Sequence, residues 1–476
     1  MKVLQISMEC YPAAKSGGLG DVVGALPIYL NKAGVSTSVI MPKHGTKWLE
    51  KQWYRQVYSD HVRLGSELIW FSIEEVMNDQ LGFPLYVANI PGKFDRPGVY
   101  SDPGGGWYGD ETERHLCFQQ AVLKWVVSMH WKPEILHCHD HHTGLIPFMV
   151  KYCPEFNSLR NMPTIFTIHN GAYHGSFSWS RVDLMPMFIA SARGYLDWAN
   201  TICPLAAGIK NCWRLTTVSP GYLDELKYDS NGMEWLITHE MAKAQGIING
   251  IDTELWDPAT DELVAFKMEN GDVEGFKAKN RVKLLDRFRI KPELPIVTFI
   301  GRLVNEKGAD IIPDTIHRAR YGGMEFGFVA LGTGDRDLMD TLGRLRNQYS
   351  GYFDASLEYN ESLAHQLYAG SDFIFMPSRV EPCGLNQMYA CRYGTIPIVR
   401  SVGGLRDTII DIGDQGGRGI RFNNFSVDDT THAIYRAIKV FENKEVLANL
   451  RQRITQVDFS WEKSAKDYIR MYEELS

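Results

Sequence analysis

Short apolar stretches alternate with longer helical patterns along almost the whole chain, and this alternation limits the possible folds more than any other feature. Most stretches are rich in β-branched residues and apolar on both faces, which is typical of parallel strands covered by helices. The pattern therefore predicts an α/β fold with doubly wound sheets. The expected strands are residues 3–7, 37–41, 68–73, 84–90, 135–138, 164–169, 215–219, 296–301, 327–332, 356–359, 373–376, 396–399 and 419–422.

The strands fall into two series, and together they exceed the usual size of one twisted open sheet. Residues 247–260 between the series are dense in turn-forming residues, and a polar helical stretch follows at 274–286. We therefore expect two Rossmann-like domains, residues 1–248 and 249–455, that face each other across a cleft. Ligands of doubly wound sheets bind beyond the carboxyl ends of the strands, so the two sheets would share one site.

Composition narrows the class of protein. The chain has 476 residues and a net charge of −7, without blocks of like charge, which argues against nucleic acid as a partner. Its eight cysteines form no Cys-x-x-Cys pair, a pattern that favours free thiols in a reducing compartment. The sequence shows neither a signal peptide nor an apolar run of about 20 residues, so we expect a cytoplasmic protein without a membrane partner.

A glycine-rich loop follows the first expected strand. Residues 15–21 read KSGGLGD and precede a helical pattern at 22–32. Such glycines let backbone N–H groups approach a ligand, a helix N-terminus favours negative charge, and Lys15 adds a cation. The loop predicts a phosphate site. The alternative is an ordinary strand-to-helix turn, because the spacing matches neither the dinucleotide fingerprint nor the Walker loop.

Two further loops in the second half carry charge at strand ends. Residues 301–308 read GRLVNEKG, in which Arg302 and Lys307 could clamp a diphosphate. Residues 377–387 read PSRVEPCGLNQ, in which Glu381 could accept hydrogen bonds from sugar hydroxyls. The helix expected after this loop could hold developing negative charge at its start. The alternative interpretation of each loop is that its charged residues are ordinary surface residues without a ligand.

Histidines gather at two strand ends of the first half, where residues 137–142 read HCHDHH and residues 167–170 read TIHN. These residue types also suit a metal site, which would make the protein a metal-dependent hydrolase. Nothing in the spacing makes ligands converge, so we expect no metal and interpret the cluster as polar side chains that grip a sugar. His137 alone could be a hydrogen-bonded core histidine.

The motifs become specific for one protein family when they occur together and in this order along the chain. Together with VSP at 218–220, NGID at 249–252, AHQLYAGSD at 364–372 and FSW at 459–461, they resemble bacterial glycogen synthases and plant starch synthases. These are retaining GT-B glycosyltransferases that use nucleotide-glucose. The resemblance covers essentially the whole chain, and it implies that a final helix, residues 456–476, packs on the first domain.

The resemblance implies three residues at the reacting centre or on the glucose: Glu381, His169 and Asp140. It implies phosphate binding by Lys15, Arg302 and Lys307, with Gly18 letting the loop close, and stacking of Tyr359 near the base. The remaining substrate-binding residues that it implies are Tyr100, Asn170, Asn249, Cys383, Gly384, Leu385 and Asn386.

The implied reaction adds glucose from ADP-glucose, or from UDP-glucose, to the non-reducing end of an α-1,4-glucan, with no cofactor. A plant-type mature chain would act in the plastid. Two alternatives stay open: a sister glycosyltransferase that uses another sugar nucleotide, and a non-catalytic glucan-binding relative.

The sequence departs from the family pattern at three positions. Asn386 stands where Thr is frequent, His141 stands where Trp is usual, and Ala206 stands where Lys is frequent. All three positions are expected near donor or acceptor, so they bear on nucleotide choice and acceptor geometry more than on the reaction class.

Overall fold

The computed structural model describes residues 1–102, 106–130 and 132–475. Residue 476, the last of the expected final helix, lies outside this part. The chain divides into two compact units. Unit 1 comprises Met1–Val218, Leu223–Ile247 and Ser464–Ser476, and unit 2 comprises Ser219–Tyr222 and Ile248–Lys463.

Within the described residues, unit 1 is built on a nine-stranded sheet with the order β12-β11-β7-β6-β1-β2-β5-β4-β3. Seven of these strands pair in parallel: β1 (Lys2–Ile6), β2 (Ser36–Pro42), β5 (Leu85–Asn89), β6 (Ile135–His139), β7 (Thr164–Ile168), β11 (Arg214–Thr217) and β12 (Ala244–Gly246). The central strands β1, β6 and β7 are buried on both faces except for Lys2, although they carry polar residues such as Gln5, His137 and His139 among their apolar ones.

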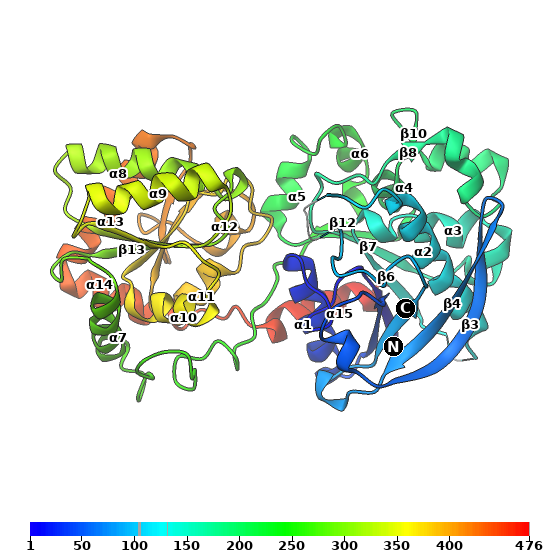
Figure 1. The fold of residues 1–476 in the computed structure, drawn as a ribbon, viewed down its shortest axis with the longest axis horizontal. Coiled ribbons are helices and arrows are strands. Elements are labelled where there is room, and N and C mark those ends of the chain that lie inside the picture. The colour runs from blue at the N-terminus through cyan, green and yellow to red at the C-terminus, as the bar shows by residue number, and fades with distance from the viewer. Residues whose placement is uncertain (103–105, 131, 476) are drawn as a thin grey trace. The chain divides into compact units, whose positions relative to one another are not determined.

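The other end of this sheet is antiparallel. β4 (Glu67–Val76) pairs with β5 and with β3 (Tyr54–Leu64), an edge strand that is absent from the strands expected from the sequence. Most side chains of β3 are exposed or half-buried, so its sequence lacks a continuous apolar run. The expectation of parallel strands was therefore wrong for this edge, where the long hairpin stands out in Figure 1.

Helices cover the unit 1 sheet: α1 (Gly18–Lys32), α2 (Glu111–Ser128), α3 (Ile146–Tyr152), α4 (Pro204–Asn211), α6 (Glu234–His239) and α15 (Trp461–Glu473). The helix α5 (Pro220–Leu226) spans a boundary between the two units: its residues up to Tyr222 belong to unit 2, and those from Leu223 belong to unit 1. A small second sheet is formed by β8 (Phe177–Ser178), β9 (Asp197–Trp198) and β10 (Thr201–Ile202). In Figure 1, α15 lies among the first elements of unit 1, and the hydroxyl of its Tyr472 is hydrogen-bonded to Gln5 of β1 and His137 of β6.

Unit 2, as described, is built on a six-stranded sheet with the order β15-β14-β13-β16-β17-β18, in which every pairing is parallel. Its strands are β13 (Ile296–Ile300), β14 (Gly327–Leu331), β15 (Phe353–Ser356), β16 (Phe373–Met376), β17 (Ile396–Arg400) and β18 (Ile420–Phe422). The strand expected at 356–359 was wrong by three residues, because Tyr359 is exposed and the side chain of Asn360 caps the next helix.

Helices lie on both faces of the unit 2 sheet, with α8 and α9 on one face and α10 and α11 on the other (Figure 1). The helices are α7 (Val273–Arg287), α8 (Ile312–Tyr321), α9 (Arg336–Gln348), α10 (Glu361–Gly370), α11 (Asn386–Arg392), α12 (Gly403–Thr408), α13 (Val427–Glu442) and α14 (Lys444–Ile454). Over the described residues, no helix combines the length and apolar character that crossing a membrane requires.

Candidate functional site

Each sheet has a point where the order of strand addition reverses. In unit 2 the chain runs from β13 outward to β14 and β15 and then returns to β16 beside β13. In unit 1 it runs from β1 to β2 and the strands beyond, and then returns to β6 beside β1. Loops diverge at such a point and leave a crevice at the carboxyl ends of the strands, which is where doubly wound sheets bind ligands.

At the reversal point of unit 2, Lys307 meets Glu381. Lys307 follows β13 and Glu381 follows β16, and Nζ of the lysine lies 2.7 and 2.8 Å from the two carboxylate oxygens. The hydroxyl of Ser378 donates to Oε2 of Glu381 at 2.9 Å. The carboxylate is buried, so both its charge and that of the lysine are held in place rather than left mobile in solvent.

Glycines let the surrounding loops approach one another. A Cβ on Gly308 would lie 2.1 Å from the carbonyl oxygen of Pro377, so the loops after β13 and β16 touch through backbone at this position. Gly384 has a φ of 72°, a left-handed conformation that glycine adopts at little cost. The amide of Gly404, in the first turn of α12, donates to the backbone carbonyl of Glu381 at 3.1 Å. Gly404 therefore belongs to this cluster, although none of the sequence motifs indicated it.

Three other residues expected at the site lie in unit 2 and differ in exposure: Arg302 follows β13, Tyr359 follows β15, and Asn386 begins α11. Arg302 is 66% exposed and only 3.8 Å from Glu306, and Tyr359 is 82% exposed, so both can turn toward a ligand. The side-chain amide of Asn386 donates to the carbonyl of Ile300 at 2.8 Å and thereby ties the start of α11 to the end of β13.

Asn249, Cys383 and Leu385 complete the expected set in unit 2. Oδ1 of Asn249 is buried and makes no hydrogen bond in the described part of the chain, which suits an atom that bonds to a ligand. Burial raises the pKa of the Cys383 thiol to about 12, so this cysteine packs as a neutral side chain. Leu385 is the residue immediately before α11 and its conformation sets where that helix begins.

At the reversal point of unit 1, a buried carboxylate organises the glycine-rich loop. Oε2 of Glu9 accepts the backbone amides of Ser16 at 2.5 Å and Gly17 at 3.0 Å, and Oε1 accepts the hydroxyl of Tyr100 at 2.6 Å. Burial raises the pKa of Glu9 above its usual range, against the hydrogen bonds that lower it. In the sequence, the signal for Glu9 is its place two residues after the expected first strand.

Lys15 and Gly18 lie at the open side of this loop. Nζ of Lys15 is 2.7 Å from Oδ1 of Asp21, and the lysine side chain is about half exposed. A Cβ placed on Gly17 or Gly18 would have no neighbour within 4 Å. The protein's own packing therefore does not require glycine there, whereas a ligand that approaches the backbone would require it.

Asp140 joins the ends of β6 and β7. Its Oδ1 accepts the backbone amides of His169 at 2.7 Å and Asn170 at 3.3 Å, so it fixes the loop that carries both residues. The backbone φ of Asp140 is 56°, a value that is strained for any residue other than glycine. Burial raises the pKa of Asp140 to about 7, opposed by those two amides.

The strand histidines form hydrogen bonds to protein atoms. His137 bonds to the hydroxyls of Tyr472 at 2.8 Å and Thr167 at 2.6 Å. His139 bonds to Gln5 at 2.6 Å and to Nε2 of His169 at 2.9 Å. Burial lowers the pKa of His137 and of His169 to about 3, so both rings are neutral at pH 7. His137 is a hydrogen-bonded core histidine, and His139 orients His169.

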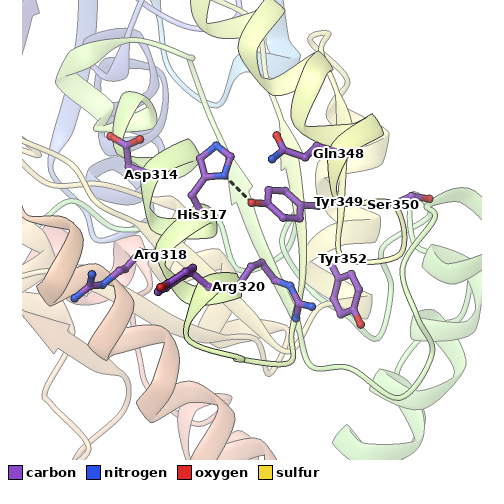
Figure 2. A pocket seen from close by; sticks show the side chains of 9 residues that line it. Asp314, His317, Arg318, Arg320, Gln348, Tyr349, Ser350 and Tyr352 are labelled. Atoms are coloured by element: carbon purple, nitrogen blue, oxygen red, sulfur yellow. Dashed lines mark hydrogen bonds between the residues drawn. The ribbon is translucent and has the colours of Figure 1, made fainter.

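A surface hollow of about 780 Å³ lies at the opposite edge of the unit 2 sheet. It is lined by the ends of α8 and α9 and by residues that precede β15, which places it at the amino end of that parallel strand. Figure 2 shows His317 hydrogen-bonded to Tyr349 and Arg320 beside Tyr352. None of the residues expected at the site lines this hollow.

Comparison with known proteins gives consistent matches over both units. The family described as starch synthase catalytic domain matches residues 2–239, and glycosyl transferases group 1 matches residues 281–457. A glycogen synthase of Flavobacterium johnsoniae is 44% identical over 99% of this chain and 98% of its own length. A glycogen synthase of Clostridioides difficile is 34% identical over the full length of both chains.

Solved structures agree with these matches. The catalytic domain of starch synthase IV from Arabidopsis thaliana, solved with ADP and acarbose, superposes with a TM-score of 0.87 at 29% identity, over 99% of each chain. Sucrose-phosphate synthase from Thermosynechococcus elongatus gives a TM-score of 0.60 at 16% identity, over 100% of this chain and 98% of its own, and shows likeness of fold alone. The predicted two-domain α/β glycosyltransferase fold is thereby confirmed.

Proposed function

The chain belongs to the starch and glycogen synthases, glycosyltransferases that build glucan, and we propose that it transfers glucose from ADP-glucose to the non-reducing end of an α-1,4-glucan. The observation that carries this proposal is the pairing of half-buried Lys307 with buried Glu381 at the reversal point of unit 2. It sets a cation and a hydrogen-bond acceptor side by side where a sugar diphosphate would need both. The relative solved with ADP and acarbose supports an adenosine diphosphate leaving group and a glucan-like ligand.

Lys307, Arg302 and Lys15 are proposed to bind the donor's two phosphates. Cleavage of the bond between the anomeric carbon and the distal phosphate leaves negative charge on the diphosphate. Fixed cations stabilise that charge more in the transition state than in the ground state, which is what lowers the barrier. Lys307 is already held by two carboxylate contacts, so little reorganisation is needed when the charge develops.

Glu381 is proposed to accept hydrogen bonds from glucose hydroxyls while it holds Lys307. The start of α11, which contains Leu385 and Asn386, directs backbone amides toward the distal phosphate in this proposal. Tyr359, with its exposed ring, supplies a surface for the nucleotide base. Cys383 and Gly384 shape the loop between Glu381 and the start of α11. Asn249 offers its buried Oδ1 as a hydrogen-bond acceptor for the ligand.

His169 and Asn170 are proposed to contact the glucose hydroxyls from unit 1. Asp140 fixes their loop through two backbone amides, and His139 orients the ring of His169. Tyr100 stacks on His142 with ring centroids 4.9 Å apart and is hydrogen-bonded to Glu9, which aligns it with the glycine-rich loop. We propose that the acceptor hydroxyl attacks on the face that the diphosphate leaves, so that configuration is retained and no side chain acts as nucleophile.

We further propose that this reaction takes place in the cytoplasm. The eight cysteines are buried free thiols, a state that a reducing compartment maintains. The glycogen synthases that the chain matches come from bacteria.

Release of nucleoside diphosphate tests the proposed function. The purified chain is given ADP-glucose or UDP-glucose, each with and without glycogen, and the released diphosphate is measured. We expect faster release from ADP-glucose, dependent on glycogen, with glucose incorporated in a form that an α-1,4-specific hydrolase removes. Faster release from UDP-glucose would overturn the choice of nucleotide, and release that is independent of glycogen would overturn the acceptor. No release from either donor would favour the binding-protein alternative.

A further inference from the structure

Three side chains that the proposed reaction does not use converge in unit 1. Glu111, His115 and His141 each offer a carboxylate oxygen or an imidazole nitrogen, and these three atoms lie within 4.8 Å of one another. Glu111 is half-buried and both histidines are buried. This combination of one carboxylate and two imidazoles is a common protein donor set for a divalent transition metal.

The two histidines have nitrogens that the protein does not satisfy. Nε2 of His115 and Nδ1 of His141 are buried and have no hydrogen-bond partner among the described residues. A buried polar atom left without a partner costs about 1–3 kcal/mol. Two such atoms on histidines of one cluster therefore indicate that something other than protein bonds to them.

Local structure holds the three side chains in position. Glu111 and His115 are four residues apart in α2, so they project from the same face of that helix. His141 opens the short helical turn that follows β6. Its ring is packed against the backbone near Gly175, where an added Cβ would lie 2.5 Å from Cδ2 of the ring. The ring therefore has little freedom to turn away from α2.

The cation next to His115 in the sequence is held mainly by backbone carbonyls. The guanidinium of Arg114 donates to the carbonyls of Lys93 at 2.8 Å and Val99 at 3.0 Å. The third guanidinium nitrogen of Arg114, Nη1, is buried and has no hydrogen-bond partner among the described residues.

We propose that Glu111, His115 and His141 form a binding site for one divalent transition metal, with zinc as the ion that this donor set favours. Two imidazoles exclude magnesium and calcium, which take oxygen ligands. In a tetrahedral zinc site, ligand atoms lie about 3.4 Å apart, so no separation in the cluster has to shorten by more than about 1.4 Å when the ion binds. The half-buried Glu111 has the freedom to make that adjustment.

The proposed metal is structural and does not depend on the proposed glucosyl transfer. It would tie α2 to the turn after β6, and Asp140, whose carboxylate accepts the backbone amide of His169, directly precedes His141 in that turn. The sequence led us to expect no metal, because nothing in the spacing of residues 137–142 and 167–170 made ligands converge, and the other two proposed ligands lie in α2. It is notable that His141 stands where the family usually has Trp, which cannot ligate a metal.

Metal titration of the whole chain tests the proposal. The protein is stripped with a chelator, and Co²⁺ and Zn²⁺ are then added separately. Co²⁺ binding is followed by visible absorption and Zn²⁺ binding by competition with a chromogenic indicator. We expect one equivalent of each ion to bind, and a rise in the thermal unfolding midpoint on Zn²⁺ addition. Glu111→Gln and His141→Ala should each weaken Zn²⁺ binding by at least about tenfold.

A matched control is His432→Ala, which removes an exposed histidine remote in sequence and should leave binding unchanged. Circular dichroism of each metal-free variant shows whether it folds. Glu111→Gln keeps the shape of the side chain and carries the test if His141→Ala does not fold. Uptake of less than one equivalent by the wild-type chain, or equal affinity in wild type and Glu111→Gln, would overturn the proposal.

Discussion

Lys15 shows how one exposed residue can matter without stabilising the fold. Its ion pair with Asp21 is partly solvated, and such pairs contribute little to stability. We expect Lys15→Ala to lower kcat/KM for the donor at least about tenfold, a loss of about 1.4 kcal/mol of transition-state stabilisation. Steady-state kinetics with varied ADP-glucose measure this. Lys439→Ala, which removes another exposed ion-paired lysine, is the control, and wild-type kinetics in Lys15→Ala would contradict its assignment to phosphate.

The Lys307–Glu381 pair should behave as one unit. Lys307→Met leaves a buried carboxylate without its cation, and Glu381→Gln leaves the lysine without its anion. We expect each single change to lower turnover at least about tenfold and the double change to cost less than the sum, with a coupling energy of about 0.5–3 kcal/mol. A double-mutant cycle on kcat/KM measures it, and strict additivity would show that the pair does not act together.

Gly18 separates a ligand role from a packing role. Because an added Cβ would meet nothing within 4 Å, Gly18→Ala should leave the thermal midpoint unchanged while it raises KM for the donor severalfold. The contrasting variant is Gly24→Ala, whose Cβ would lie 2.5 Å from the carbonyl of Tyr11 and which should destabilise the fold by about 1–3 kcal/mol. Calorimetry and donor kinetics on both variants decide the matter, since an unchanged KM in Gly18→Ala would remove Gly18 from the binding loop.

At the level of single residues, the sequence indicated the charged motifs better than the residues that hydrogen-bond to those motifs. Lys307 and Glu381 stand out because each follows an apolar strand within a glycine-containing loop. Glu9 and Ser378 were missed, because a lone carboxylate or hydroxyl in a loop has no pattern until the fold shows what it contacts. Glu111 and His115 were missed for the same reason, since they look like ordinary residues on the surface of a helix.

Among the elements, α15 is the one whose contribution to stability can be measured most directly. The hydroxyl of Tyr472 is bonded to Gln5 and His137 in the buried interior of unit 1. Tyr472→Phe leaves those two polar side chains short of a partner, so we expect a loss of about 1–3 kcal/mol in the free energy of unfolding. Urea denaturation measures it. Arg470→Ala, an exposed change in the same helix, should stay within about 0.5 kcal/mol of wild type, and an equal loss in both variants would contradict a specific role for the hydroxyl.

The elements also show which parts of the fold a sequence can predict. Strands such as β16 are buried on both faces, and their unbroken apolar runs mark them clearly. β3 has mostly polar or half-exposed positions and is recognised only through its pairing with β4. The error at 356–359 arose because an aromatic residue was taken as part of a strand, although Tyr359 lies exposed in the turn that leads to α10.

For the whole molecule, the buried histidines predict a stability that depends on pH. Burial lowers the pKa of His137 to about 3 in the folded chain, whereas the unfolded chain keeps the ordinary value of 6.5. As pH falls below 6.5, the unfolded state gains a proton that the folded state does not, so stability is lost on acidification and regained as pH rises.

Comparison of His137→Gln with wild type tests this. Between about pH 7 and about pH 5, we expect the variant's free energy of unfolding to fall less steeply with falling pH than that of wild type. The two slopes should differ by up to about 1.4 kcal/mol per pH unit, because the variant lacks the one proton that His137 takes up on unfolding. Urea unfolding at several pH values gives both slopes. Parallel slopes would mean that His137 protonates equally in the folded and unfolded chain.

The division of the chain into units has a consequence for how the protein is made. Unit 1 takes its last segment, Ser464–Ser476, from beyond the whole of unit 2. A ribosome therefore completes every residue from Ile248 to Lys463 before it delivers Tyr472, the partner of Gln5 and His137. Until then the first unit carries an unfinished interior, which gives a chaperone a defined interval in which to bind it, while unit 2 can complete its own sheet as it emerges.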